Sequence, residues 1–420
     1  MDVLVVGGGG REHAICWSLR KSPRVDTLYC APGNGGISEI AECVNIVATD
    51  IEKMLAFVKE KKIDFVVVAP DDPLALGMVD SFEAAGVRVF GPRKGAAKLE
   101  SSKIYAKGIM KKYGIPTADY NVFTDIEEAR SYIRDNGAPL VVKADGLALG
   151  KGVVVAMDVE TALEAVDMMM LEKKFGDSGS RIIIEECLTG PEVTVLVFTD
   201  GNTVVPMPSA QDHKRVFTGD VGPNTGGMGA FSPTPYYTDE IADHCMKTII
   251  QPTIDAMNSE GCPFKGVLFF GLMLTPKGPR VIEYNARFGD PETQPILSML
   301  ETDLLDVFEA VVDGRLQELN IMWRGGYACC IVMASGGYPW DYEKGYEITG
   351  LDDVPDDVTV FHAGTALKDG VFVTNGGRVL GITATSDTLE SASARAYEGV
   401  SMINFEKSHY RTDIGNNFNK

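Results

Sequence analysis

The sequence predicts a multidomain α/β protein. With 420 residues, the chain is too long for one ordinary hydrophobic core, which indicates two to four domains. Residues 1–100 alternate apolar runs with amphipathic stretches, the βαβ pattern of a parallel sheet with helices on both faces. Short strands and glycine-rich turns predominate over 325–420. We therefore expect an N-terminal parallel-sheet domain, a small C-terminal α+β domain and further α/β units between them.

The N-terminal domain is expected to span residues 1–100. Its strands are predicted over four buried apolar runs, residues 3–6, 27–30, 65–69 and 87–90, and its helices over 12–20, 51–61 and 74–85. Gly91 and Pro92 then break the pattern and end the unit.

The middle of the chain is expected to contain a linker helix and two α/β units. The linker spans 101–116, the smaller unit 117–188 and the larger unit 189–315. Strands are predicted over 140–143, 153–156, 181–185, 193–198, 266–274 and 280–285, with a helix over 159–171. A polar, glycine-rich loop over 209–232 interrupts the larger unit, and such long loops in compact domains are usually functional. The C-terminal domain ends in a helix over 389–403.

Composition and charge argue against several classes of partner. The formal net charge is −20, and binding to nucleic acid or an anionic membrane needs a basic surface. No apolar run approaches the ~20 residues of a membrane span, and the chain starts directly with a strand. The eight cysteines include no Cys-x-x-Cys pair, which favours reduced, buried thiols. We expect a cytoplasmic protein with neither nucleic acid nor membrane as partner.

Residues 142–153 predict a site for nucleotide phosphates. Lys143 lies on an apolar run, and a glycine-rich loop with a second lysine, Lys151, follows it. Gly150 and Gly152 allow the backbone to approach where a Cβ atom would clash, and the lysines neutralise phosphate oxygens.

A second motif, residues 281–292, predicts a metal site. The alternation of a strand puts Glu283, Asn285 and Arg287 on one face. A carboxylate and an amide oxygen suit Mg²⁺, which takes few protein ligands when nucleotide phosphates complete its shell. Together the two motifs predict that the protein binds and uses ATP.

The glycines at residues 7–10 predict an anion site, because they join a strand to the start of a helix. A Rossmann fingerprint for NAD is the main rival. Its third glycine would fall on Glu12, however, and the second strand runs into Asn34 without an acidic residue for a ribose. A phosphate or phosphosugar is favoured, and a purely structural turn stays an alternative.

Two acidic segments leave alternatives open. Asp71 and its neighbour end a strand before a helix, where one carboxylate can bind sugar hydroxyls while Asp72 caps the helix. Residues 182–188 form an apolar strand whose backbone can pair with a planar base, and Glu192 can hold a ribose. Ordinary surface acids are the alternative for this second segment.

With these motifs in view, the chain resembles the phosphoribosylamine–glycine ligases, also called glycinamide ribonucleotide synthetases, of the ATP-grasp superfamily. The resemblance runs nearly end to end, through residues 7–13, 32–34, 143–153, 211–215, 222–229, 287–292 and 375–380. The combination of 211–215, 222–229 and 287–292 is the most specific part, because the glycine-rich loop alone indicates only ATP-grasp. The resemblance implies a pre-ATP-grasp N-terminal domain and a two-lobed ATP-grasp domain that holds ATP between its lobes.

The resemblance also implies a reaction. ATP, glycine and 5-phosphoribosylamine would give glycinamide ribonucleotide, ADP and phosphate in de novo purine synthesis, through a glycyl phosphate and with Mg²⁺ or Mn²⁺. Transient contact with neighbouring purine-pathway enzymes is a further expectation. The rival functions are an ATP-grasp ligase or kinase for a different acid, and a non-catalytic ATP-binding sensor.

On the matching positions, we assign each role to residues of this chain. Catalysis is assigned to Arg287, Asp212 and Lys214, and the metal to Glu283 and Asn285. The nucleotide is assigned to Lys103, Lys143, Gly150, Lys151, Gly152, Glu185, Glu186, Leu188 and Glu192. The substrates are assigned to Gly8, Gly9, Gly10, Arg11, Asn34, Asp71, Asn224, Gly226, Gly227, Pro291 and Glu292. Three positions depart from the usual pattern: Asp71 replaces Glu, Leu149 replaces Ala, and Gly271 stands where many other ATP-grasp enzymes have a metal-binding Glu.

Overall fold

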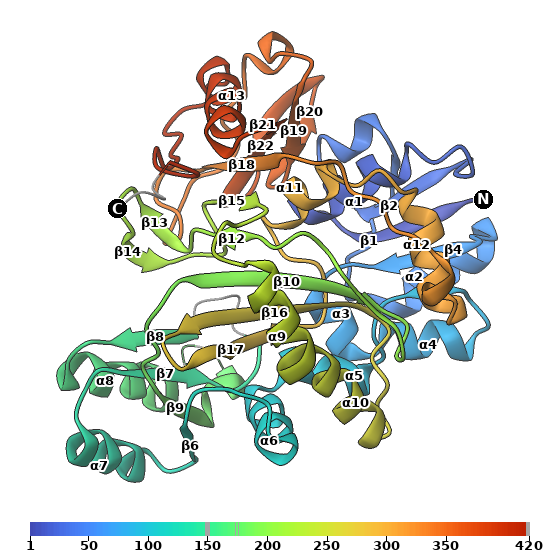
Figure 1. Ribbon diagram of the computed structural model, residues 1–420. Helices are drawn as coiled ribbons and strands as arrows, with labels where there is room; N and C mark the ends of the chain where they lie inside the picture. The colour runs from blue at the N-terminus through green and yellow to red at the C-terminus, as the bar shows by residue number, and fades with distance from the viewer. Residues whose placement is uncertain (148–151, 173, 175, 417–420) are drawn as a thin grey trace.

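The structure, a computed structural model, describes residues 1–147, 152–172, 174 and 176–416. Figure 1 shows the N-terminal region in blue, the C-terminal region in red above it, and the region around β7 and β8 at the lower left. The prediction of a multidomain α/β fold with an N-terminal parallel sheet is confirmed.

The N-terminal region is built on a parallel sheet with the strand order β3-β2-β1-β4-β5. Its strands are β1 (Val3–Gly7), β2 (Leu28–Pro32), β3 (Glu42–Cys43), β4 (Phe65–Val68) and β5 (Val89–Phe90). Its helices are α1 (Gly10–Leu19), α2 (Ile51–Lys61), α3 (Asp71–Leu76) and α4 (Met78–Ala84). Because the strands are parallel, their carboxyl ends meet at one edge, where Gly8, Asn34 and Asp71 follow β1, β2 and β4.

Two details of the N-terminal prediction are wrong. The helix expected over 74–85 is split into α3 and α4, because Gly77 between them adopts a left-handed backbone conformation with φ of 93°. Helix α3 also starts at Asp71 with Pro70 as its N-cap, so Asp72 does not cap it.

Two helices lead into the smaller lobe, α5 (Lys94–Ser101) and α6 (Lys103–Tyr113). This lobe has an antiparallel sheet, β6-β9-β7-β8, made of β6 (Tyr120–Phe123), β7 (Leu140–Ala144), β8 (Val153–Ala156) and β9 (Ile182–Glu186). Helices α7 (Ile126–Asn136) and α8 (Val159–Val166) pack on it through a separate core that includes Ile133, Val142 and Ile184.

The larger lobe has the antiparallel sheet β11-β10-β16-β17. Its strands are β10 (Glu192–Thr199), β11 (Val204–Pro206), β16 (Gly266–Thr275) and β17 (Gly278–Asn285), and its helices are α9 (Asp239–Cys245), α10 (Gln251–Ser259), α11 (Thr293–Ser298) and α12 (Leu304–Asp313). One buried core joins this lobe to the N-terminal sheet, since Leu4, Val195 and Phe270 belong to the same cluster.

The prediction of an irregular loop over 209–232 is wrong. This segment forms β12 (Gln211–Asp212), β13 (Arg215–Phe217), β14 (Val221–Asn224) and β15 (Gly229–Ser232). Strands β13 and β14 form a hairpin, whereas β15 pairs with β18 (Tyr327–Ala334) of the C-terminal region. Strands this short show no clear alternation, and the partner of β15 lies far along the chain.

The C-terminal region completes the antiparallel sheet β12-β15-β18-β22-β19. It adds β19 (Val358–His362), β20 (Thr365–Lys368), β21 (Val371–Thr374), β22 (Arg378–Ser386) and α13 (Leu389–Met402), which packs on β18 and β22. Short 3-10 helices at Ile37–Glu39, Gly176–Gly179, Leu316–Glu318 and Leu351–Asp353 and π-helices at Asp167–Leu171 and Met246–Ile250 complete the elements.

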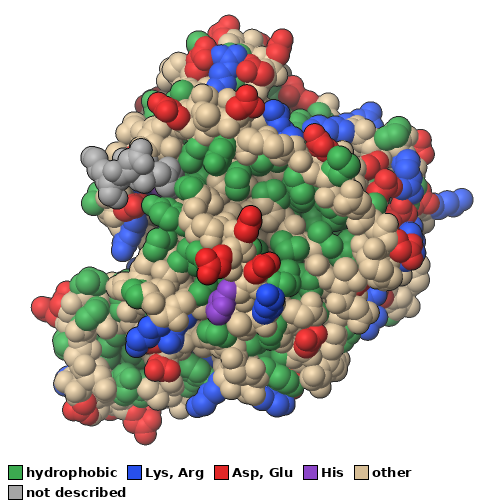
Figure 2. All heavy atoms as spheres, in the orientation of Figure 1, with side chains coloured by type: hydrophobic (Ala, Val, Ile, Leu, Met, Phe, Trp, Pro, Cys, Tyr) green, Lys and Arg blue, Asp and Glu red, His purple; other side chains and the backbone are tan. Residues whose placement is uncertain are grey.

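The charge distribution on one face and the lengths of the helices can be described directly. On the face shown in Figure 2, Lys and Arg side chains are interspersed with Asp and Glu, and no broad basic surface is visible there. In the described part of the chain, no helix is both long enough and apolar enough to cross a membrane.

Candidate active site

Lys143 connects the two lobes. It lies on β7 of the smaller lobe, where its side chain is buried. Its Nζ atom pairs with Glu185 Oε2 of β9 at 2.9 Å and donates to the Ile282 carbonyl of β17, in the larger lobe, at 3.1 Å. The predicted phosphate-binding lysine therefore lies beside the strand that carries the predicted metal ligands.

Glu185 has a second cationic neighbour that the sequence analysis missed. Lys107 Nζ on α6 lies 3.2 Å from Glu185 Oε1, and burial lowers the pKa of Lys107 to about 8. Lys107 was not among the site residues predicted from the sequence. Lys107 follows Ala106 and lies close to Ile109 and Met110, and these three apolar residues are buried. Their spacing in the sequence could have shown that Lys107 lies on the buried face of the helix.

The start of the glycine-rich loop is held by Lys103. Its Nζ donates to the Gly146 carbonyl at 2.9 Å, and burial lowers the pKa of this lysine. Gly152 lies at the other end of the loop, where its carbonyl accepts the Ala144 N–H. The remaining predicted loop residues, Leu149, Gly150 and Lys151, lie outside the described residues.

The hinge between the lobes carries an ion pair and a cavity. Glu186 Oε1 at the end of β9 lies 3.3 Å from Arg280 Nη1 of β17 and accepts the Asp119 N–H. A cavity of about 660 Å³ lies here, lined in part by Thr117, Glu186 and Arg280. The predicted residue Leu188 follows in the connection to β10 and is half-buried.

Lys214 lies between two of the predicted acidic residues. Its Nζ contacts Glu192 and lies 3.1 Å from Glu283 Oε1. Lys214 is the main cause that lowers the pKa of Glu283 to about 2, so this carboxylate stays ionised at neutral pH. Burial disfavours the charge of Lys214, but Glu192 and Glu283 together raise its pKa well above its usual value.

Glu283 and Asn285 have the chemistry that Mg²⁺ requires. They supply an ionised carboxylate and an amide oxygen from one strand. Within the described ranges, no group of three or more His, Cys, Asp or Glu side chains could hold a metal ion by itself. A site with few protein ligands fits an ion that also binds nucleotide phosphates. Gly271 faces Glu283 across β16 and β17, and a Cβ atom there would lie only 3.0 Å from Glu283 Cγ.

Arg287 lies next to the metal pair although β17 ends at Asn285. Its Nη2 atom is 3.2 Å from Asn285 Oδ1 and 2.6 Å from Glu100 Oε1. Glu100, at the end of α5, also accepts the Ala286 N–H, and burial raises its pKa to about 7. Glu100 was not predicted as a site residue, because nothing in the local sequence distinguishes it from a surface acid on a helix.

The N-terminal glycine turn is fixed by its own helix and by the larger lobe. Glu12 Oε2 accepts the Gly9 N–H at 2.6 Å, and Arg11 Nε lies 2.9 Å from Glu12 Oε1. Arg11 Nη1 donates to the Phe288 carbonyl at 2.8 Å. Close packing requires glycine in this turn, since a Cβ atom at Gly8 would overlap the Gly33 carbonyl oxygen.

Asn34 and Asp71 occupy the same edge of the parallel sheet. Asn34 Nδ2 donates to the Gly8 carbonyl at 3.0 Å and to the His362 carbonyl at 2.8 Å, while its Oδ1 accepts the Ile37 N–H. Both ends of this amide are thus bound to backbone groups. Asp71 is half-exposed at the start of α3, and its Oδ1 accepts the Asp72 N–H.

The half-buried Asp212, the buried Glu292 and an arginine from the C-terminal region lie near the segment after β17. Burial, together with the nearby Glu292, raises the pKa of Asp212 well above its usual value, and burial likewise raises that of Glu292. Arg378 Nη1 donates to the carbonyls of Gly226 and Asp290, each at 2.6 Å. Arg378 was not among the predicted site residues, although it lies in the motif at 375–380.

Glycine is required where these segments meet. A Cβ atom at Gly227 would overlap Pro291 Cδ and lie 2.5 Å from Asp212 Oδ1. Asn224 is paired with Arg215 in the hairpin β13–β14. The structure thus brings the predicted residues Gly227, Pro291 and Asp212 into one cluster.

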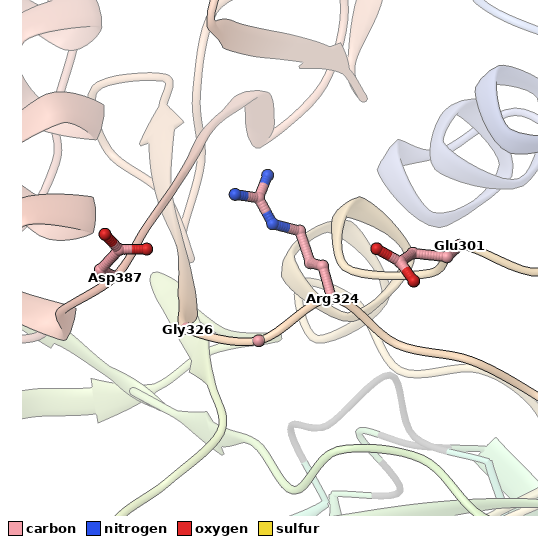
Figure 3. Close-up of a pocket in the computed structure, with 5 residues that line it drawn as sticks. Glu301, Arg324, Gly326 and Asp387 are labelled. Carbon is pink, nitrogen blue, oxygen red and sulfur yellow. The ribbon is translucent and has the colours of Figure 1, made fainter.

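A different surface pocket lies away from these groups. It has a volume of about 520 Å³ and is lined by Glu301, Arg324, Gly325, Gly326 and Asp387. Figure 3 shows Arg324 between Asp387 and Glu301. None of its lining residues is a predicted site residue, so this pocket is not our candidate active site.

Comparison with known proteins identifies the family. The matching family models are the N domain, the ATP-grasp (A) domain and the C domain of phosphoribosylglycinamide synthetase, over residues 1–100, 101–293 and 328–417. The chain is 50% identical to a phosphoribosylamine–glycine ligase of Halalkalibacterium halodurans, over 99% of this chain and 96% of that protein. The chain belongs to the phosphoribosylamine–glycine ligase family. A relative of the same name from Brucella melitensis is also 50% identical, over 99% of this chain and 97% of that protein.

Solved structures agree with this family membership. The phosphoribosylamine–glycine ligase of Thermotoga maritima superposes with a TM-score of 0.85 at 36% identity, covering 98% of this chain and 100% of that one. The biotin carboxylase domain of a Hydrogenobacter thermophilus 2-oxoglutarate carboxylase has a TM-score of 0.75 at 16% identity, covering 97% of this chain and 91% of that one. The second likeness shows the shared fold alone.

Proposed function

We propose that this protein joins glycine to 5-phosphoribosylamine with ATP, giving glycinamide ribonucleotide, ADP and phosphate in purine biosynthesis. Identity of 50% to phosphoribosylamine–glycine ligases over 99% of the chain supports this proposal. The observation that carries it is the convergence of contacts on the segment after β17. Within a few residues, this segment places Arg287 beside Asn285, and it offers backbone carbonyls to Arg11 and Arg378.

The reaction needs positioning and charge neutralisation rather than a protein nucleophile. The glycine carboxylate attacks the γ-phosphate of ATP and displaces ADP, and the amine of phosphoribosylamine then attacks the carbonyl of the glycyl phosphate and releases phosphate. We assign Lys103 and Lys143 to the nucleotide phosphates. Glu283 and Asn285 would hold Mg²⁺, which neutralises phosphate charge when bound. Gly150, Lys151 and Gly152 are assigned to the same phosphates, and Glu185, Glu186, Leu188 and Glu192 to the nucleoside.

Arg287 and Lys214 are assigned to the transferring phosphoryl group and the glycine carboxylate. Arg287 presents a planar guanidinium next to Asn285, a geometry that suits a carboxylate or an acyl phosphate. Lys214 lies between Glu192 and Glu283 and so brings a positive charge to the predicted metal ligand.

Asp212 and Glu292 are assigned to the proton that the attacking amine loses. Two neighbouring carboxylates resist ionising at the same time, so the pair has a raised affinity for a proton. A proton released near Gly227 and Pro291 can therefore be held by this pair.

The phosphosugar is assigned to the turn at residues 8–11 and to Asp71. The turn presents a helix N-terminus and Arg11, both of which attract a phosphate. Asn224, Gly226, Gly227 and Pro291 complete the proposed substrate side. Asn34 acts by holding the turn, since its amide is bound to the carbonyls of Gly8 and His362.

An ADP-release assay with freshly made phosphoribosylamine tests the proposed function. We expect full ADP formation only when ATP, glycine and phosphoribosylamine are all present. Turnover with a different acid and none with glycine would support another ATP-grasp ligase. ATP binding without ADP release under any of these conditions would support a sensor.

Four further points stay proposals. They are the division of the chain into 1–100, 101–116, 117–188, 189–315 and 325–420, the use of Mn²⁺ in place of Mg²⁺, a cytoplasmic location, and contact with neighbouring purine-pathway enzymes. The expected absence of nucleic acid and membrane partners rests on the net charge of −20.

A further inference from the structure

Three buried charged side chains form a row between helix α6 and strand β7. Lys107, Glu185 and Lys143 are each at most 4% exposed. Lys107 Nζ lies 3.2 Å from Glu185 Oε1, and Lys143 Nζ lies 2.9 Å from Glu185 Oε2. Each lysine thus faces one oxygen of a single carboxylate.

The two lysines differ in how many protein oxygens lie around their ammonium groups. An ammonium group has three N–H donors. In the described part of the chain, Lys107 Nζ faces three protein oxygens. It donates to Thr117 Oγ1 at 2.8 Å and to the Ala118 carbonyl at 3.3 Å, and it forms an ion pair with Glu185 Oε1. Lys143 Nζ faces two there, Glu185 Oε2 and the Ile282 carbonyl. Among the described residues, three protein oxygens thus surround the ammonium group of Lys107 and two surround that of Lys143, so Lys143 is the better placed of the two to contact a ligand.

Lys107 also compensates a carboxylate that is otherwise poorly satisfied. Among the described residues, Glu185 Oε1 has no hydrogen-bond donor with suitable geometry, so its negative charge is balanced there by the ion pair with Lys107. If Lys107 were absent, Lys143 would have to balance the whole negative charge of Glu185. A buried carboxylate with one cationic partner holds that partner strongly, because separating the two leaves an uncompensated buried charge.

We propose that Lys107 is a positioning residue for nucleotide binding, because it shares the charge of Glu185 and so leaves Lys143 free to contact the phosphates. Lys107 touches neither nucleotide nor substrate in this role. The proposal rests on the proposed function in one respect only, the assignment of Lys143 to nucleotide phosphates.

The test is the affinity for ADP with Mg²⁺, measured by calorimetry, together with steady-state kinetics and a melting curve. Lys107→Met should weaken ADP binding about tenfold and raise KM for ATP by a similar factor, with a smaller change in kcat. Lys111→Met, on the exposed face of the same helix one turn later, is the matched control and should bind ADP as the unmodified protein does.

Lys107→Arg separates positioning from a structural role. It keeps a positive charge opposite Glu185, so ADP affinity should stay within about threefold of the unmodified protein. Lys107→Met leaves the ion pair between Glu185 and Lys143 in place and so creates no unpaired buried charge. If Lys107→Met does not fold, Lys107→Gln, which can still donate to Thr117 and Ala118, takes its place with the same expected loss of ADP affinity.

Two results would overturn the proposal. One is a folded Lys107→Met variant with unchanged ADP affinity. The other is a folded Lys107→Arg variant that binds ADP no better than Lys107→Met, which would make Lys107 a purely structural residue. If the unmodified protein binds ADP but does not ligate glycine, the proposed function is refuted. The effect of Lys107→Met on ADP affinity can still be measured in that case.

Discussion

The two ends of the proposed site are held together by different interactions. At the nucleotide end, charged side chains pair with one another, as Lys143 does with Glu185 and Lys214 with Glu283. At the substrate end, Arg11 pairs with Glu12 of its own helix, but it contacts the larger lobe through the Phe288 carbonyl. Arg378 likewise donates to the backbone carbonyls of other segments. Ion pairs can exchange partners when a charged nucleotide arrives, whereas a turn enclosed by backbone contacts is ordered beforehand. The comparison indicates that the nucleotide end adjusts on binding and the substrate end is preorganised.

Replacing Arg287 should have the largest effect, because this residue lies where the two ends meet. Arg287→Ala should cost about 3–4 kcal/mol of transition-state stabilisation, roughly a hundred- to thousand-fold in kcat/KM for glycine, since a positioned donor is lost. ADP affinity should change little. Steady-state kinetics with varied glycine and direct ADP binding measure the two quantities.

The control for Arg287 is Arg395→Ala, which removes an arginine that pairs with Asp357 and Glu398 on the C-terminal surface. It should leave kcat/KM unchanged. If Arg287→Ala keeps the unmodified kcat/KM, then its pairing with Glu100 is only structural and the two ends are not linked by this residue.

Glu283→Gln should separate metal use from stability at the nucleotide end. The amide keeps the shape of the side chain but removes the charge that Mg²⁺ and Lys214 both require. Activity should fall strongly at limiting Mg²⁺, while the melting temperature changes little. A titration of activity against Mg²⁺ concentration beside a melting curve measures this, and unchanged activity at limiting Mg²⁺ would exclude Glu283 from the metal site.

The nucleotide end was easier to predict from the sequence than the contacts that support it. Lys143 and Glu283 lie on strands whose patterns are local, and the structure places the strands within a residue or two of the predicted bounds. Lys107, Glu100 and Arg378 were missed, because each acts through a partner far along the chain. Helix and strand periodicity carries no information about such pairings.

The substrate end shows the same limit in its backbone. The segment 209–232 looked irregular, since β15 is completed only by β18, about a hundred residues later. For Asn34 the sequence indicated a place at the sheet edge, but only the structure shows that its amide is bound to Gly8 and His362.

Gly227→Ala should break the preorganised substrate end. The new Cβ atom would press on Pro291 and Asp212, and Gly227 has a φ of +113°, which disfavours other residues. We expect a loss of about 1–3 kcal/mol in folding stability and a clear fall in kcat/KM for phosphoribosylamine. Denaturant unfolding and steady-state kinetics measure these effects.

Gly219→Ala is the matched control for backbone strain. Gly219 has a φ of +83° in the β13–β14 hairpin, but a Cβ atom there meets no other atom within 4 Å. It should lose stability from its backbone conformation alone and keep its activity. Equal loss of activity in both variants would mean that strain in this region, rather than the contact with Pro291 and Asp212, limits catalysis.

The smallest expected effect concerns pH and the junction between α1 and β19. His13 Nδ1 accepts the His362 N–H, and burial lowers the pKa of His13 to about 3 from its usual 6.5. Because only the unfolded chain takes up this proton between those values, stability is complete above pH 6.5 and falls as the pH drops toward 3. The loss should approach about 1.4 kcal/mol per pH unit.

His13→Gln keeps a side-chain acceptor but does not titrate. Its unfolding free energy should therefore fall less steeply than that of the unmodified protein between pH 6 and pH 5, as denaturant unfolding at each pH would show. His244→Gln, at an exposed position, should leave the slope unchanged. Identical slopes for His13→Gln and the unmodified protein would mean that His13 is not held neutral at this junction.

The central claim is that ATP activates the carboxylate of glycine within this site. The most direct test uses glycine labelled with ¹⁸O in its carboxylate, together with ATP and phosphoribosylamine, and analyses the released phosphate by mass spectrometry. If a glycyl phosphate forms and the amine displaces its phosphate, each phosphate carries one ¹⁸O atom from glycine. Phosphate without ¹⁸O, formed alongside glycinamide ribonucleotide, would contradict the account.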